Sequence, residues 1–233
     1  RQIVLKNIGA KGQKKILSAK VLIVGVGGLG CPAAENLVRA GIGTIGLIDN
    51  DVVNLSNIHR QSLFNSKDIK KSKVSVAAQK LKEINPLTKI KTYRLRLNKN
   101  NVKNIFENYE IIIDGSDNFK TKFLINDYCK KLKKKLVSGA ISKFDGHIFT
   151  FDFKDKKTAS LKNFYQEKEI SDDILNCEFD GVLGTTATIV GTTQANEALK
   201  MIMEIGQNLK NQILIIDLLN LSFKKIRFKK NKI

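Results

Sequence analysis

The sequence predicts an α/β protein with a Rossmann-like, mostly parallel sheet, helices on both faces, and antiparallel strands added in the C-terminal half. Three observations predict this fold. Short apolar runs alternate with helix-length amphipathic stretches through residue 138. A glycine-rich turn, "GVGGLG", joins the first apolar run to the first amphipathic stretch. Residues 146–153 then alternate with a period of two, as a half-exposed strand does.

Strands and helices are expected to alternate through the first half of the chain. Lys20–Val24 is an apolar run bounded by glycine, and Leu29–Ala40 has helical spacing and stops before Gly41. Lys73–Ile84 is a predicted helix closed by Asn85-Pro86, because proline bars continuation. The other elements expected here are the strands Thr44–Ile48, Ile90–Leu95, Glu110–Ile113 and Lys135–Ser138 and the helix Phe119–Lys133.

The second half is expected to extend the same sheet. Gly146–Phe153 is predicted to be a half-exposed strand, and Thr185–Ile205 a long helix rich in small residues. Leu214–Leu219 and Leu221–Phe228, separated only by Asn220, predict a closing antiparallel pair. Because no repeat, low-complexity linker or Pro/Ser-rich boundary interrupts the pattern, residues 1–233 are interpreted as a single domain.

The composition is that of a globular protein with an unusually basic surface. Hydrophobic residues make up 42% and charged residues 27%, while 41 Lys+Arg against 22 Asp+Glu give a net charge of +19. The excess is almost all lysine and is spread along the chain, so we interpret it as a solvated surface and do not expect nucleic acid as a partner. No run approaches the roughly 18 apolar residues of a membrane span. Arg1 begins no secretory signal, and we expect a cytoplasmic protein without a membrane partner.

The glycine-rich turn predicts a nucleotide site. In a turn between strand and helix, a first glycine permits the tight bend, a second lets the backbone approach phosphates, and a third lets helix and strand pack closely. Gly25, Gly27, Gly28 and Gly30 stand in this context. Asp49, at the end of the second strand, is placed to accept hydrogen bonds from ribose hydroxyls. NAD and ATP both fit these residues, so the turn alone leaves the nucleotide open.

Polar residues further along the chain favour a triphosphate. Asn57, Arg60 and Gln61 follow Asp49, and Lys73 opens the next helix. An NAD enzyme has no general need for this group, whereas breaking a bond between the α- and β-phosphates requires neutralised charge, which an arginine fork supplies. Asp117 follows the strand Glu110–Ile113, where a carboxylate can hold Mg²⁺ together with substrate phosphates. The alternative role for Asp117 or Asn118 is a helix N-cap.

Together these motifs resemble, in order and spacing, the ubiquitin-activating-enzyme-like superfamily, and within it the bacterial ThiF/MoeB/HesA adenylyltransferases. The resemblance covers essentially the whole chain. It begins at "RQI", residues 1–3, and includes the segment "GVLGTTATIVGTTQANEALKMI". As a set the motifs are specific, although the glycine turn alone is not.

The resemblance implies ATP- and Mg²⁺-dependent adenylation of the C-terminal glycine carboxylate of a small ubiquitin-fold sulfur carrier ending in Gly-Gly, with release of pyrophosphate. Thiamin and molybdopterin pathways use such enzymes, and a sulfur-donating desulfurase is a further expected partner. The family's homodimers imply that Arg1 acts in the partner's site. The implied nucleotide-binding residues are Gly25, Gly27, Gly28, Gly30, Asp49, Asp51, Asn57, Arg60, Gln61, Lys73, Asp117 and Asn118, and Asp117 is the implied Mg²⁺ ligand.

Cys177 matches the position of a crossover-loop cysteine in thiamin-pathway members, which implies bonding to the activated carrier or sulfur transfer. The alternative is a loop cysteine that takes no part.

Two features depart from the family pattern. The regions where many relatives carry CxxC pairs read "KKTASLKNFYQ" and "RFKKNKI", so no zinc is expected. Lys70 stands where relatives often have glycine, so Lys70 and Lys71 are both crowded beside the implied phosphate ligand Lys73.

Three other interpretations remain open from the sequence. An NAD-dependent oxidoreductase explains the glycine turn and Asp49 but leaves the residues from Asn57 to Gln61 and Asp117 without a role. An ATP-dependent tRNA-modifying dehydratase of the same superfamily would suit the high positive charge, although residues 181–202 favour the carrier-activating branch. A binding module that has lost catalysis is the third, against which the retained phosphate and Mg²⁺ residues argue.

Overall fold

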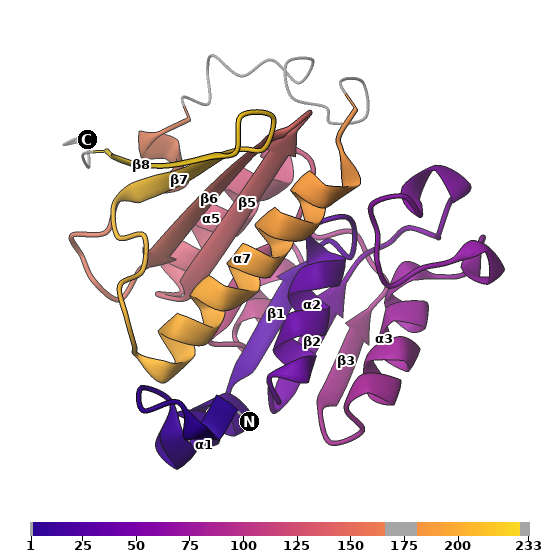
Figure 1. The fold of residues 1–233 in the computed structure, drawn as a ribbon, viewed down its shortest axis with the longest axis horizontal. Helices are drawn as coiled ribbons and strands as arrows, with labels where there is room; N and C mark the ends of the chain where they lie inside the picture. The colour runs from indigo at the N-terminus through magenta and orange to yellow at the C-terminus, as the bar shows by residue number, and fades with distance from the viewer. Residues whose placement is uncertain (1, 166–180, 229–233) are drawn as a thin grey trace.

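A computed structural model describes residues 2–165 and 181–228. These residues build one eight-stranded sheet in the order β3-β2-β1-β4-β5-β6-β7-β8 (Figure 1). Neighbouring strands run parallel from β3 through β5 and antiparallel from β5 through β8. The strands are β1 (Lys20–Val24), β2 (Thr44–Ile48), β3 (Lys89–Tyr93), β4 (Ile111–Asp114), β5 (Lys135–Ser142), β6 (Asp145–Asp152), β7 (Gln212–Asp217) and β8 (Ser222–Arg227).

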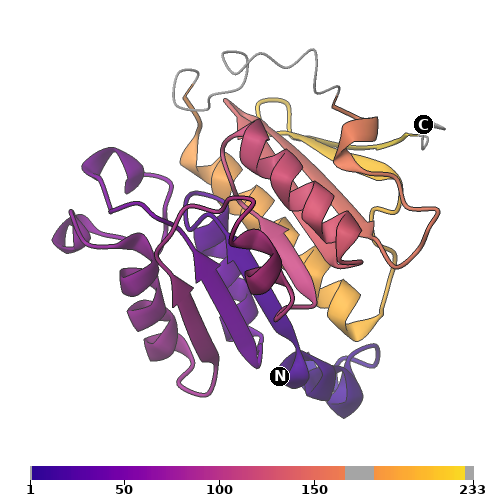
Figure 2. The same cartoon turned by 180° about the vertical axis from the view of Figure 1, so that it is seen from behind.

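Helices cover both faces of the sheet. Figure 1 shows α2, α3 and α7 on one face, and Figure 2, from behind, shows α5 on the other. The α-helices are α1 (Gly9–Ser18), α2 (Gly30–Arg39), α3 (Lys73–Ile84), α4 (Val102–Phe106), α5 (Phe119–Lys131) and α7 (Gly184–Met203). Short 3-10 helices are η1 (Gln2–Val4), η2 (Leu55–Asn57), η3 (Ser66–Asp68) and η4 (Leu161–Asn163). In the described part of the chain, no helix is both long and apolar enough to cross a membrane.

The strands are apolar throughout because both faces of the sheet are buried. On β1, Val21 and Ile23 pack into the core beneath α2, α3 and α7. Leu22 and Val24 alternate with them and pack beneath α4 and α5. This explains why the central strands show continuous apolar runs, as parallel strands covered on both sides do.

The Rossmann-like fold and every predicted element of the first half are confirmed, with ends that shift by a few residues. Two helices were not predicted. In α1 only Gly12 and Ile16 are buried, so its sequence lacks a wide apolar stripe, and α4 is only five residues long.

The expectation of a half-exposed strand at Gly146–Phe153 is wrong, because β6 is buried along most of its length. On one face Gly146 lies against Val190 of α7, so closely that a Cβ there would overlap it. On the other face Phe149 packs against Phe164 and Phe228. The period of two therefore separates non-aromatic residues (Gly146, Ile148, Thr150) from aromatic ones, not buried residues from exposed ones.

Helix α7 crosses α2 at a close contact that also supports the glycine turn. A Cβ at Gly191 would overlap the carbonyl oxygen of Leu29 and lie 2.6 Å from Cγ of Pro32. Leu29 is the N-cap of α2 and belongs to the turn that follows β1. The absence of a side chain at Gly191 thus lets α7 press directly on the backbone of this turn.

Replacing Gly191 with alanine is expected to lower the free energy of unfolding by roughly 1–3 kcal/mol, because overpacking a buried contact costs about this much. Urea unfolding followed by circular dichroism measures the change. Asn196→Ala, exposed on the same helix, is the control and should stay within about 0.5 kcal/mol of the wild type. Equal stability of the two variants would mean that α2 and α7 can separate at no cost.

Candidate functional site

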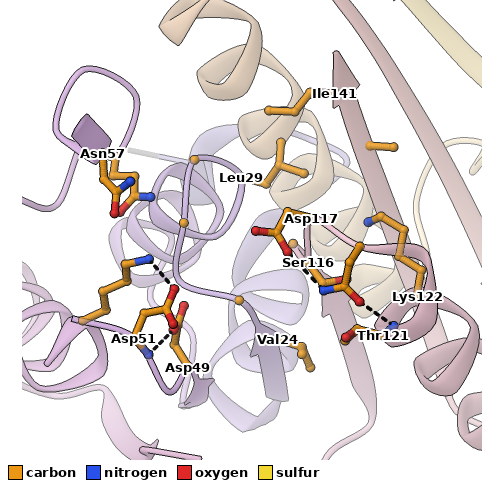
Figure 3. Close-up of a pocket in the computed structure, with 18 of the residues that line it drawn as sticks. Val24, Leu29, Asp49, Asp51, Asn57, Ser116, Asp117, Thr121, Lys122 and Ile141 are labelled. Carbon is orange, nitrogen blue, oxygen red and sulfur yellow. Dashed lines mark hydrogen bonds and ion pairs between the residues drawn. The ribbon is translucent and has the colours of Figure 1, made fainter. Parts of the chain in front are cut away.

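A pocket of about 530 Å³ lies at the carboxyl ends of the parallel strands. It is centred where β1 and β4 are neighbours and the strand order changes direction, which is where open α/β sheets bind ligands. Figure 3 shows two walls, with Asp49, Asp51 and Asn57 on one side and Asp117 with Lys122 on the other. The residues expected in the site that line this pocket are Gly25, Gly27, Gly28, Asp49, Asp51, Asn57, Arg60, Gln61, Lys73, Asp117 and Asn118.

Among the expected site residues in the described part of the chain, Gly30 alone does not line the pocket. Gly30 lies behind the turn, where a Cβ would overlap the carbonyl oxygen of Gly25, so its part is to let helix and strand pack. Arg1 and Cys177 lie outside the described residues. Their roles stay predictions.

The glycine turn is held by its own backbone geometry. Gly25 has a φ of +87°, and a Cβ there would lie 2.7 Å from the carbonyl oxygen of Gly115 in the turn after β4. A side chain would be strained by the dihedral and would clash with the second turn. At Gly27 a Cβ would meet only the Gln61 side chain, at 3.6 Å. The middle of the turn therefore leaves its backbone open to a ligand.

Asp49 ties this turn to the end of β2. Its Oδ2 accepts a hydrogen bond from the backbone N–H of Val26 at 2.8 Å, and its Oδ1 accepts one from that of Asp51 at 2.8 Å. Burial raises the pKa of Asp49, and the nearby charge of Lys73 opposes that shift. Each carboxylate oxygen has a second lone pair, so Asp49 can hold the turn and still accept a hydroxyl.

Lys73 is the lysine of its cluster that faces the pocket. Its side chain is 7% exposed, and its Nζ is 3.0 Å from Oδ2 of Asp51. Lys70 and Lys71 are exposed and are not among the pocket residues. Lys70 has a φ of +69°, the left-handed region that favours glycine. That conformation explains the glycine often found at this position, and the geometry selects Lys73 among the three lysines.

Arg60 and Gln61 flank the same wall. The Nη1 of Arg60 donates to the Ser56 carbonyl at 3.1 Å and lies 2.7 Å from Nε2 of His59. Because a guanidinium has no acceptor, Nε2 of His59 must be the unprotonated nitrogen in this contact. Gln61 is 3% exposed and lies against Gly27, and its buried Oε1 has no hydrogen-bond partner within the described residues.

On the opposite wall, Asn118 is the N-cap and leaves Asp117 exposed to the pocket. Oδ1 of Asn118 accepts from the backbone N–H of Thr121 at 2.9 Å, and its Nδ2 donates to Oδ1 of Asp117 at 3.1 Å. The N-cap role that the sequence offered to Asp117 or Asn118 therefore belongs to Asn118, and Mg²⁺ binding by Asp117 stays a prediction. The amide caps α5, and the carboxylate lines the pocket.

Sequence reasoning missed Lys122, although a signal for it existed. It lines the pocket and forms a buried ion pair with Asp114, with an Nζ to Oδ2 distance of 3.2 Å. Phe119, Lys122, Phe123 and Asn126 are all buried, at the i, i+3, i+4 and i+7 spacing of one helix face. A lysine on such a face is a candidate for a buried charge with a partner.

His147, to which the sequence gives no role, also lines the pocket. Its Nδ1 is 2.8 Å from the hydroxyl of Tyr165, and the two rings are stacked. Burial lowers the pKa of His147, and the nearby Asp145 carboxylate opposes that shift. The side chain is therefore neutral at pH 7, and no sequence spacing could have paired it with Tyr165.

Comparison with known proteins decides the family. The ThiF family matches residues 1–232. The chain belongs to this family. The sulfur carrier protein adenylyltransferase of Thermus thermophilus is 36% identical over 99% of this chain and 86% of its own length. The probable adenylyltransferase/sulfurtransferase MoeZ of Mycobacterium tuberculosis is 36% identical over 99% of this chain and 59% of its own. The suspected ThiF/MoeB relationship is confirmed.

Solved structures agree on the fold. A crystal structure of E. coli MccB with SeMet MccA has a TM-score of 0.84 at 22% identity, covering 96% of this chain and 67% of that one. The crystal structure of SeMet PaaA has a TM-score of 0.78 at 20% identity, with 94% and 67% covered. The chain thus spans about two thirds of these proteins and 59% of MoeZ. Because these relatives are named as adenylyltransferases, the alternative interpretation as an NAD-dependent oxidoreductase is not supported.

The lowered pKa of His147 predicts a stability change in mild acid. A folded state with a lowered histidine pKa binds fewer protons than the unfolded chain, whose histidine has a pKa of about 6.5. The free energy of unfolding therefore keeps its full value above this unfolded pKa, and it decreases as pH falls through the lowered pKa of the folded state. Urea unfolding between pH 7.5 and 5.5 should show this loss, and His147→Gln should reduce it.

His59→Gln is the matched control, because His59 is exposed and is the other of the two histidines in the chain. Asp49, whose raised pKa gives the opposite slope in acid, is unchanged in both variants and cancels in the comparison. The same pH dependence in wild type and His147→Gln would rule out burial of a neutral His147.

Proposed function

We propose that this adenylyltransferase of the ThiF family transfers AMP from ATP to the C-terminal glycine carboxylate of a small ubiquitin-fold sulfur carrier, releasing pyrophosphate. One observation carries the proposal. A glycine turn with open backbone, the cationic side chains of Arg60 and Lys73, and the exposed carboxylate of Asp117 all line one pocket. Hydride transfer to or from a nicotinamide has no general need for Arg60, Lys73 or Asp117.

The pocket supports a specific pose for ATP. Asp49 accepts the ribose hydroxyls, and the backbone at Gly27 and Gly28 approaches the phosphates. Arg60, with Asn57 and Gln61 beside it, contacts the phosphates from the next turn, because its planar fork matches phosphate oxygens. Lys73 adds a point charge from the N-terminus of α3, where its ion pair with Asp51 already fixes the ammonium. These assignments are proposals that rest on pocket geometry.

The residues present fit Mg²⁺ when it arrives with the nucleotide. Mg²⁺ binds through one or two carboxylates together with substrate phosphates and water. The described residues contain no group of three His, Cys, Asp or Glu side chains that could hold a metal on their own. Asp117 offers one exposed carboxylate at the pocket. Bound there, Mg²⁺ would neutralise phosphate charge, and the protein contributes the Asp117 ligand.

The reaction itself needs positioning and charge, without a general base. A glycine carboxylate is ionised at neutral pH, so its oxygen attacks the α-phosphorus directly. The bond to the bridging oxygen breaks, and that oxygen leaves with its electron pair in pyrophosphate. Arg60 and Lys73 stabilise the charge that develops on the phosphates, which is the larger part of such catalysis.

The carrier and assembly are proposed from relatives and from the family resemblance. The relatives' names include a sulfur carrier protein adenylyltransferase and, in Gracilaria tenuistipitata var. liui, a probable molybdopterin-synthase adenylyltransferase. We place the chain in a thiamin- or molybdopterin-type pathway of the cytoplasm, with a desulfurase as sulfur donor. We also propose a homodimer in which Arg1 reaches the partner's pocket, and sedimentation velocity tests for the dimer.

Pyrophosphate exchange tests the proposed activity. Wild type should exchange labelled pyrophosphate into ATP only when a carrier ending in Gly-Gly and Mg²⁺ are present. Arg60→Ala and Lys73→Ala should each lose roughly 10²–10³ in exchange rate, because each removes a cation from the reacting phosphates. Lys71→Ala removes the same charge from an exposed position outside the pocket and should keep wild-type exchange.

Absence of exchange with every such carrier would overturn the proposed function. Equal losses in Lys73→Ala and Lys71→Ala would instead overturn the assignment of Lys73. Binding of modified tRNA that persists at physiological salt, with no carrier-dependent exchange, would favour the dehydratase of the same superfamily.

Cys177 is the cysteine to test for sulfur transfer. Burial raises the pKa of Cys31 to about 12 and holds that of Cys129 well above its ordinary value, so neither buried thiol is a reactive thiolate. Cys177→Ser should keep carrier-dependent exchange and lose formation of the carrier thiocarboxylate, detected by mass spectrometry with a desulfurase and cysteine. Unchanged thiocarboxylate formation would remove Cys177 from the reaction.

A further inference from the structure

A buried charged cluster lies directly behind the loop that carries Asp117. Lys122 is 3% exposed and Asp114 is 1% exposed at their side chains, and the two form an ion pair. Nζ of Lys122 also donates to the carbonyl of Gly139 on β5. A buried ion pair is weak evidence for stability, because well-packed apolar residues often serve as well. Its place on the pocket wall therefore invites a functional explanation.

The Asp114 carboxylate joins β4 to both neighbouring segments of the wall. Its Oδ1 accepts from the backbone N–H of Ser116 at 3.0 Å and from the Ser116 hydroxyl at 2.6 Å. Its Oδ2 accepts from the Ser138 hydroxyl at 2.6 Å and from Lys122 at 3.2 Å. Ser116 immediately precedes Asp117, so these bonds fix the backbone that presents the Asp117 carboxylate.

Helix α7 holds the cluster from behind. Nε2 of Gln194 donates to the backbone carbonyl of Asp114 at 2.8 Å, and Gln194 is fully buried. A Cβ at Gly139 would lie 2.7 Å from the Gln194 amide carbon. The end of β4 therefore cannot move away from the pocket without breaking these contacts. The wall beyond it, residues 140–142, lines the same pocket.

Lys122 also links the two ends of the Asp117 loop. It lies in the first turn of α5, whose N-cap is Asn118, and Asn118 donates to Asp117. Asp114 therefore holds the loop at its start, while α5 holds it at its end. The Lys122 ammonium, which contacts the Asp114 carboxylate and the Gly139 carbonyl, connects α5 to the end of β4 and to β5. In Figure 3 Lys122 and Asp117 lie on the same wall of the pocket.

We propose that Lys122 is a positioning residue for the adenylation reaction, which sets the position of the Asp117 carboxylate through its ion pair with Asp114. This rests on the proposed function only in its assignment of Asp117 to the metal that accompanies ATP. Partners behind a metal ligand typically change metal affinity by roughly 10–100-fold when they are lost. Lys122 is thus expected to matter for nucleotide only when the metal is present.

Calorimetric titration with α,β-methylene-ATP, in Mg²⁺ and in EDTA, tests the proposal without the carrier. Lys122→Met should raise the dissociation constant roughly 10–100-fold in Mg²⁺ and leave it unchanged in EDTA. Lys122→Arg keeps the charge and should recover most of the affinity. In an Asp117→Asn background, Lys122→Met should have no further effect, because the two residues act on one contact.

Ser138→Ala keeps the test decisive if Lys122→Met does not fold. Ser138 is 2% exposed, does not line the pocket, and donates to Asp114, so it reaches the ligand only through that carboxylate. It should show the same Mg²⁺-dependent loss. Thr150→Ala is the matched control, since Thr150 is equally buried and its hydroxyl has no hydrogen-bond partner within the described residues.

The contrary outcomes are distinct. Losses of equal size in Mg²⁺ and EDTA would mean that Lys122 contacts the nucleotide itself. Equal losses in Ser138→Ala and Thr150→Ala would mean general destabilisation, and additive losses with Asp117→Asn would separate Lys122 from Asp117. Any of these overturns the proposal. A wild type that binds nucleotide with this metal dependence but adenylates no carrier would overturn the proposed function and leave the positioning role standing.

Discussion

The close backbone contact between the turns after β1 and β4 is the constraint on which the rest of the site depends. Gly25 adopts a φ of +87° with its Cβ position 2.7 Å from the carbonyl oxygen of Gly115. Two loops from separate βα units can meet only where neither carries a side chain at the contact. This contact places the open backbone of the first turn beside the loop that carries Asp117. Helix α7 presses on the same region through Gly191, so the C-terminal half also shapes the pocket.

Charge in the pocket is organised as buried or half-buried pairs on opposite walls. Lys73 pairs with Asp51 on one wall, and Lys122 pairs with Asp114 on the other. Each cation is fixed before any ligand arrives, so little reorganisation is needed when phosphate charge enters. Burial in this arrangement disfavours the ionised form of Asp49: it raises the pKa of that carboxyl, and the charge of Lys73 only partly opposes the shift. The net charge of +19 is a property of the whole chain, whereas the site depends on these few placed pairs.

The sequence predicted what local spacing controls. The apolar runs of β1 and β2, the start of α3 at Lys73 and the glycine turn all follow from neighbours a few residues apart. It missed what depends on strand pairing and layer packing. Asp114 meets Ser138 because β4 and β5 pair in that register, and β6 is buried because α7 and the aromatic residues around Phe164 cover its two faces. The Lys122 spacing carried a helical signal, but its partner Asp114 became visible only in three dimensions.

The short motif from Asp114 to Asn118 combines three separate tasks. The oxygens of Asp114 are taken up by Ser116, Ser138 and Lys122, so that carboxylate is part of the scaffold and is a poor metal ligand. Asn118 caps α5 and orients its neighbour. Asp117 is the acidic side chain of this motif that stays exposed to the pocket. Two aspartates three residues apart, equivalent by composition, thus differ in surroundings, because Asp114 ends a buried strand and Asp117 lies in the exposed loop just before the N-cap of α5. Because of this difference, Lys122, which does not contact Asp117, can set the position of the Asp117 carboxylate through Asp114.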